Sequence, residues 1–373
     1  MKFKVKAKTL LKVLNAAEKF RSNKALIPAL AGFLINVTED GIAVTAAGSE
    51  AAVRVTAKYN GTDMQIDETG TAVFPARLRN IVSACDCDVI TVSAPEDVAN
   101  IRYGGSRFKV TLIPANDYPR FGFPEEGTSF SADAGEVTGF IKSVSFAAAK
   151  GGTRPALEGV NLRLKDSVLQ AEATDSYRVA VNTMSVDASE EAEGSVLVNA
   201  KAMEHLSVFP DSEVRFFIGK NLCFKGEDDN FSVEAEVRTI DAAFPSLDSL
   251  MRGEDSCQRE FQIRNEILSS AADRASLFAG DDHHIVTFDL KSDKCKLSAQ
   301  SLEIGSSDEE LADCTYTGEG GTYSFDLRYV KEVLKTGGRD DDIKVKFMGD
   351  LRPAYFSVGE NSGRYVILPV RTF

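Results

Sequence analysis

The densest group of metal-ligating side chains in this sequence is the run Asp281-Asp282-His283-His284, which follows Gly280. Carboxylates and imidazoles are common zinc ligands, so a metal-dependent hydrolase is one interpretation of this run. Four consecutive residues cannot all converge on one ion, however, and the run separates a helix-like segment from a strand-like one. A polar connecting loop is therefore the other interpretation, and the sequence leaves both open.

Other chemistry is sparse. Cys85-Asp86-Cys87 has no second cysteine pair at zinc-site spacing, and Gly104-Gly105 lacks the lysine and hydroxyl residue of a phosphate loop. The six cysteines are too dispersed for a disulfide scaffold, so we expect reduced thiols. We predict no catalytic residues, no cofactor and no resident metal, and therefore no enzyme.

Composition narrows the class of protein further. The chain has 373 residues, 43% apolar and 27% charged, which is long enough for two or three globular domains. No apolar run approaches the roughly 20 residues that span a bilayer, and the start resembles no signal peptide. We expect a soluble cytoplasmic protein without a membrane partner. The absence of Trp and the scattering of Phe and Tyr argue against a stacking platform for single strands.

The elements that must position any site repeat at a spacing of about 125 residues. Each third opens with a helix-like stretch (8–20, 136–150 and 265–278), continues as alternating strands, and adds a second helix (73–85, 196–208 and 323–336). Asn199 and Asp326 are suited to cap two of these second helices. We predict an α+β fold of three repeated domains, each with two helices packed on antiparallel sheet, with boundaries at 1–125, 126–252 and 253–373.

Charge is distributed unevenly between these elements. The six predicted helices together carry +7, counted over residues 8–20, 75–85, 136–150, 199–208, 264–275 and 326–339. The whole chain carries −13, which leaves −20 for the remainder. A single helix with a few solvated lysines needs no explanation. Six helices biased in the same direction, if they shared one surface, would form a positive track on an acidic body, suited to phosphate contact without base readout.

The chain resembles the bacterial sliding clamps, the β subunits of the replicative DNA polymerase III holoenzyme. The resemblance covers the whole chain and rests on ALIPALAGFLINV, VFPARLRNIV, SRFKVTLIPANDYPRF, TRPALEGVNLRL, ATDSYRVAV and YVILPVRTF, of which ATDSYR and the terminal LPVR are the most specific. It implies two chains closing a ring around duplex DNA, with helices lining the hole. Expected partners are duplex DNA, the replicative polymerase, the clamp loader, repair polymerases and other clamp-motif proteins, and a second copy of the chain, in the bacterial nucleoid.

The resemblance also implies residues for three sites. Cations lining the hole would be Lys24, Arg77, Lys150, Arg154 and Lys201. A pocket for short apolar peptides would be formed by Leu157, Thr174, Tyr177, Arg178, Val179, Pro245, Leu250, Tyr329, Val366, Leu368, Pro369 and Arg371. The dimer interface would set Arg107, Phe108 and Val110 against Leu277 and Phe278, with Glu303, Glu309 and Glu310 offering charges.

Among the predicted pocket residues, Val179, Val366 and Leu368 could instead be ordinary core residues of a strand. Ser176 and Tyr177 stand where Gly and His are common in the family, Ser249 replaces a frequent Arg, and Asp326 replaces a frequent Asn. The function that we predict is a non-enzymatic processivity factor. The alternatives are the hydrolase built on Asp281 to His284 and a repeat scaffold that binds proteins but no DNA.

Overall fold

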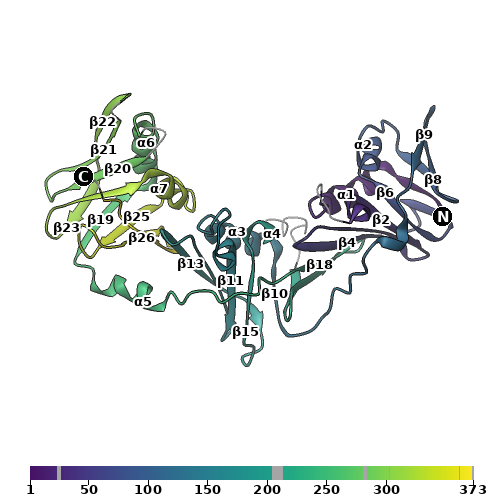
Figure 1. Cartoon of the computed structure of the whole chain (residues 1–373), viewed down its shortest axis with the longest axis horizontal. Helices are drawn as coiled ribbons and strands as arrows, with labels where there is room; N and C mark the ends of the chain where they lie inside the picture. Colours follow the sequence, from purple (N-terminus) through teal and green to yellow (C-terminus); the bar gives the residue numbers. More distant parts are fainter. Residues whose placement is uncertain (23–26, 204–212, 280–283, 302, 361, 372–373) are drawn as a thin grey trace. The chain divides into compact units, whose positions relative to one another are not determined.

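The computed structural model describes residues 1–373 except 23–26, 204–212, 280–283, 302, 361 and 372–373 (Figure 1). The chain divides into two compact units. The first comprises residues 1–139, 164–167 and 186–239, and the second comprises 140–163, 168–185 and 240–373. Both units therefore include part of the middle third of the chain.

The predicted threefold repeat of two helices is present, but each third opens with a strand and not, as predicted, with a helix. The first helix of each third follows a strand directly, in the pairs β1 (Lys2–Lys6) and α1 (Ala7–Glu18), β10 (Thr128–Asp133) and α3 (Ala134–Ser145), and β19 (Arg259–Arg264) and α6 (Asn265–Ala275). The second helix also follows a strand, in the pairs β6 (Gly70–Pro75) and α2 (Arg77–Ser83), β15 (Gly194–Asn199) and α4 (Ala200–Met203), and β24 (Gly321–Asp326) and α7 (Leu327–Leu334). The fold is thus mixed α and β in three domains, as predicted.

Apolar spacing explains the helices, and side-chain caps explain where two of them begin. In α1, Leu10, Val13, Leu14 and Ala17 are all buried, which places one apolar stripe against the sheet. The Asn199 side chain accepts a hydrogen bond from the Lys201 backbone N–H at 2.9 Å. Asp326 does the same for the N–H of Arg328 at 2.9 Å. Both predicted caps are confirmed.

The first unit contains two antiparallel sheets. The larger runs in the order β14-β10-β16-β17-β18-β4-β3-β2-β6, and the smaller in the order β5-β1-β7-β8-β9. Their remaining strands are β2 (Gly32–Thr38), β3 (Gly41–Ala47), β4 (Ala51–Lys58), β5 (Met64–Glu68), β7 (Val89–Ser93), β8 (Val98–Tyr103), β9 (Ser106–Thr111), β14 (Asp187–Ala188), β16 (Glu213–Ile218), β17 (Leu222–Glu227) and β18 (Phe231–Val237).

The second unit also contains two sheets. One includes the run β11-β12-β13-β27-β26-β25-β19-β23, and the other has the order β22-β21-β20-β24. Their remaining strands are β11 (Gly159–Lys165), β12 (Val168–Thr174), β13 (Arg178–Ser185), β20 (Ile285–Leu290), β21 (Cys295–Ser301), β22 (Gly305–Glu310), β23 (Cys314–Thr317), β25 (Asp342–Phe347), β26 (Ala354–Val358) and β27 (Arg364–Ile367). Short helical turns are η1 (Pro28–Ala31), η2 (Ala115–Asp117), η3 (Pro155–Glu158), α5 (Asp248–Met251) and η5 (Arg252–Ser256).

Consecutive domains are joined by strand pairing. Strand β4 of the first third pairs with β18 of the second third, with Val55 opposite Val233. Strand β13 of the second third pairs with β27 of the last, with Val179 opposite Val366. Ladder hydrogen bonds therefore run through both junctions, and the second junction carries the residues of the predicted pocket. Among the described residues, no helix is both long and apolar enough to cross a bilayer.

Candidate functional site

Three residues of the predicted pocket lie in one row across neighbouring strands of the second unit. Thr174 is opposite Val179, and Val179 is opposite Val366. The row continues to Tyr355, which is opposite Val366 on β26. Val179 is 6% exposed and Val366 is 1% exposed, so both valine side chains belong to the core. They form a buried apolar base on which other side chains rest.

Exposed apolar groups stand directly beside this row. The Leu368 backbone N–H donates to the Tyr177 carbonyl at 2.9 Å, which brings the segment after β27 against the segment before β13. Tyr177 is 63% exposed and Leu368 is 37% exposed. Large apolar side chains exposed together, above a buried apolar base, mark a surface suited to a partner. Leu368 is therefore not plain strand core.

Arg178 is the charged centre of the same region, and its donors are taken up by the chain itself. Its guanidinium donates to Asp175 at 2.9 Å, to the Phe146 carbonyl at 2.6 Å and to the Glu332 carboxylate. It also lies over the Tyr329 ring, 4.3 Å from the centroid. Burial raises the pKa of the Tyr329 hydroxyl, and the nearby Asp175 carboxylate adds to that shift. Arg178 thus packs against one face of the Tyr329 ring.

The segment between the second and third domains covers the other side of the row. Leu250 packs against a buried cluster that contains Val179 and Val366. The sequence prediction missed further members of this cluster, which are Val181, Phe244, Leu247, Met251, Tyr355 and Cys257. Their residue types are ordinary for a core, so only their position beside the predicted residues identifies them.

The remaining predicted pocket residues are less closely tied to the row. Leu157 is buried in η3, Pro245 is exposed ahead of α5, Pro369 is half-buried and Arg371 is exposed. Ser176, which stands where the family commonly has Gly, has a φ of 80°. Side chains other than Gly and Asn rarely adopt this left-handed conformation, so the chain holds a glycine-like backbone with a serine.

The predicted DNA-contacting cations are solvent-exposed wherever the structure describes them. Arg77 begins α2, Lys201 lies in α4, and Arg154 precedes η3, all exposed. The Lys150 side chain is 82% exposed, with its Nζ 3.9 Å from Glu332. Lys24 lies outside the described residues. The structure leaves these four described cations accessible to a phosphate.

Each half of the predicted dimer interface lies on or beside the edge strand of a sheet. β9, which carries Arg107, Phe108 and Val110, ends the five-stranded sheet, and β22 ends the four-stranded sheet. Val110 is buried, whereas Leu277 is 68% exposed and Phe278 is half-buried.

The acidic side chains predicted at this interface are partly engaged within the chain. Glu309 accepts from the Arg274 guanidinium at 2.7 Å, and Glu310 pairs with Lys294 at 2.7 Å. Glu303 is exposed in the turn that precedes β22. Of the three, Glu303 is therefore the most available to a partner.

The possible metal run lies mostly outside the described residues, which exclude Asp281, Asp282 and His283. His284 is described and has a φ of 45°. Within the described part of the chain, no group of three or more His, Cys, Asp or Glu side chains is arranged to hold a metal ion.

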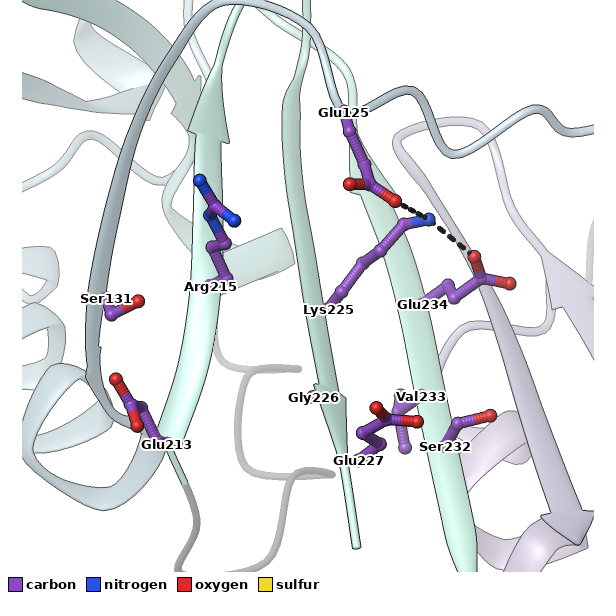
Figure 2. Close-up of a pocket in the computed structure, with 10 residues that line it drawn as sticks. All are labelled: Glu125, Ser131, Glu213, Arg215, Lys225, Gly226, Glu227, Ser232, Val233 and Glu234. Carbon is purple, nitrogen blue, oxygen red and sulfur yellow. Dashed lines mark hydrogen bonds and ion pairs between the residues drawn. The ribbon is translucent and has the colours of Figure 1, made fainter.

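A polar hollow of about 690 Å³ lies on the larger sheet of the first unit, over β10, β16, β17 and β18 (Figure 2). Lys225 bridges Glu125 and Glu234, each at 2.8 Å. This ion pair ties the segment that follows the first domain to the sheet. The described residues that line the hollow include four glutamates and two cations, Arg215 and Lys225, so the hollow stays acidic.

Comparison with protein families decides what these features belong to. Three family models, for the N-terminal, central and C-terminal domains of the DNA polymerase III beta subunit, match residues 1–122, 133–246 and 255–371 in order. The chain belongs to the DNA polymerase III beta subunit family.

Relatives of this beta subunit family match over their full length. The beta sliding clamp of Staphylococcus aureus is 27% identical over 384 residues, with all of both chains covered. A solved DNA polymerase sliding clamp from Bacillus subtilis has a TM-score of 0.92 at 26% identity, again with full coverage of both chains. The beta subunit structure from Thermotoga maritima, at 22% identity and a TM-score of 0.89, shows the same fold.

Membership of the beta subunit family confirms the predicted fold class and the predicted function as a polymerase processivity factor in DNA replication. The hydrolase alternative finds no support in these relatives, and neither does a scaffold that is independent of DNA. The individual site residues, by contrast, remain predictions.

Proposed function

We propose that two copies of this chain close into a ring around duplex DNA and tether the replicative polymerase to its template. The ring would have no catalytic group, because retention on DNA is topological and needs no bond to be broken. Weak, mobile phosphate contacts suffice for such a protein, and base edges need not be read. The beta subunit family supports the DNA and polymerase partnership and the dimer.

The observation that carries the ring is the pair of edge strands. β9 and β22 each have a sheet neighbour on one side in the described part of the chain. Beside β22, Leu277 is 68% exposed and Ile304 is 55% exposed. Exposed apolar groups next to an open edge invite uncontrolled pairing, and a specific partner strand removes that hazard. We assign that partner to β9 of a second copy, through Arg107 and Phe108.

The lumen contacts are proposed for Lys24, Arg77, Lys150, Arg154 and Lys201. Four of them are exposed and are carried on or near helices, and Lys24 is retained on the family resemblance alone. The exposed cations would attract DNA at the helices, and the acidic remainder of the chain would repel it elsewhere. Each contributes a small, salt-sensitive attraction that permits sliding.

The peptide pocket is proposed for the twelve residues predicted from the resemblance, around Tyr177, Val179 and Leu368. The polymerase, the clamp loader and repair polymerases would compete for it by inserting short apolar motifs. A few buried aliphatic or aromatic anchors provide most of the binding energy in such sites.

We also retain the domain boundaries 1–125, 126–252 and 253–373, which the three matched ranges support. A protein that acts on replicating bacterial DNA would be found at the nucleoid.

Loading onto circular DNA tests the ring directly. Protein loaded onto nicked circular DNA should remain bound in moderate salt, and cutting the circle should release it, because direct phosphate attraction fades with salt whereas topology does not. Equal retention on circular and linear DNA, with loading verified on both, would contradict encirclement. A parallel assay for hydrolysis of nucleotides and esters should show none.

A further inference from the structure

The cross-strand row beneath the proposed pocket extends beyond the residues already assigned to it. Tyr355 lies opposite Val366, and Lys346 of β25 lies opposite Tyr355. Both side chains reach the segment of residues 244–257 that connects the second and third domains. Because this segment carries the predicted wall residue Leu250, its position determines where that wall stands.

Tyr355 contacts the connecting segment closely. Its side chain is 4% exposed, and its hydroxyl donates to the Leu250 carbonyl at 2.9 Å. Burial raises the pKa of this hydroxyl, so it stays protonated and able to donate at neutral pH. Gly253 allows the approach, since a Cβ at that position would overlap the Tyr355 hydroxyl.

Charges fasten the same segment on both sides. Lys346 donates to Glu254 at 2.9 Å, and this hydrogen bond raises the pKa of Lys346. On the side of the second domain, Arg163 lies 3.8 Å from Asp248 at the start of α5. The Arg163 contact is long and exposed, so it restrains the segment only weakly. The Leu250 carbonyl itself accepts from the backbone N–H of Arg252 and from the Tyr355 hydroxyl on β26.

We propose that Tyr355 is a positioning residue for peptide binding: its hydroxyl holds the Leu250 backbone so that the Leu250 side chain forms a fixed wall. This inference rests on the proposed pocket. If the Leu250 wall is already ordered in the free protein, peptide binding does not lose conformational entropy in ordering it. The hydroxyl therefore strengthens affinity without contacting the peptide.

The test uses Tyr355→Phe, which removes only the hydroxyl, in the full chain. The probe is a short fluorescein-labelled peptide with leucine and phenylalanine side chains between polar residues, followed by fluorescence anisotropy. The matched control is Tyr316→Phe, because Tyr316 is 6% exposed and also donates to a backbone carbonyl, that of Glu319, at 2.6 Å. We expect Tyr355→Phe to weaken the peptide about two- to tenfold, and Tyr316→Phe to leave affinity unchanged.

A double-mutant cycle separates positioning from general destabilisation. In a Leu250→Ala background, Tyr355→Phe should have no further effect on affinity, because the wall that it holds is gone. Gly253→Ala, which displaces the hydroxyl without altering Tyr355, should reproduce the loss, and it decides the matter if Tyr355→Phe does not fold.

The measurements distinguish failure of the positioning role of Tyr355 from failure of the proposed pocket. Unchanged affinity in Tyr355→Phe, with Leu250→Ala and Leu368→Ala both weakened, overturns the positioning role and leaves the pocket standing. An equal loss in Tyr316→Phe, or full additivity with Leu250→Ala, overturns it as well. If neither Leu250→Ala nor Leu368→Ala affects the peptide, the proposed pocket fails and this inference fails with it.

Discussion

The Arg178 guanidinium lies over the Tyr329 ring at 4.3 Å from its centroid and bonds the Glu332 carboxylate one helical turn away. Arg178 begins β13 in the second domain, whereas both partners lie on α7 in the third. A planar cation can stack on a ring and donate in its plane at once, which a lysine cannot do. One side chain therefore joins two domains and supports an aromatic wall of the proposed pocket.

Replacing Arg178 with methionine should destabilise the second unit by about 2 to 4 kcal/mol, because it removes the buried cation that bonds both Asp175 and Glu332. Chemical denaturation measures this change. Lys150→Met is the control, since Lys150 is 82% exposed beside the same Glu332, and should cost at most about 0.5 kcal/mol. Similar losses in the two variants would show that the buried network is not what stabilises this junction.

Leu368→Ala and Tyr329→Ala should each weaken an apolar peptide by roughly 1 to 2 kcal/mol, about five- to thirtyfold, with little change in dimer mass. Anisotropy titration measures the effect. His283→Ala combined with His284→Ala should bind the peptide like the parent and support polymerase stimulation normally. Parental affinity in both pocket variants would place the partner site elsewhere.

Leu277→Glu combined with Phe278→Glu should convert the dimer to monomers at micromolar concentration, because an unpaired charge buried in an apolar contact costs several kcal/mol, on the order of 3 to 5. Sedimentation velocity provides the mass. Leu351→Glu is the matched control, since Leu351 is also an exposed leucine, at 63% against 68% for Leu277. A double variant that still sediments as a dimer would rule out this interface.

The pairing of Arg274 with Glu309 predicts an acid dependence for the third domain. The hydrogen bond from Arg274 lowers the pKa of the Glu309 carboxyl below 4.5, so the pair stabilises the fold above that value and ceases to do so as pH falls through the lowered pKa. Thermal melts should show parent and Glu309→Gln differing at pH 6, with the difference shrinking as the pH is lowered through the range in which the Glu309 carboxyl titrates. Glu360→Gln, in an exposed turn of the same domain and outside the proposed interface, should track the parent throughout. A constant difference across this range would mean that the ion pair is not the cause.

Local patterns in the sequence predicted the helices and their repeat, but not the strands β1, β10 and β19 that open each third. The stripe Leu10, Val13, Leu14 and Ala17 predicts its helix, and Asn199 and Asp326 predict where two others begin, because spacing and capping act within a few residues. The pocket and interface residues were beyond such reasoning and came from the family resemblance, since their types alone do not distinguish a binding wall from a core.

Tertiary structure alone decided which distant residues meet. Thr174, Val179, Val366 and Tyr355 form one row because β12, β13, β27 and β26 pair in a particular register, and a shift by one residue would turn each side chain to the opposite face. Likewise, Arg178 reaches Glu332 across 154 residues of chain only because β27 brings the third domain against β13. Register and long-range contact depend on the packing of the whole chain, so no local pattern in the sequence contains them.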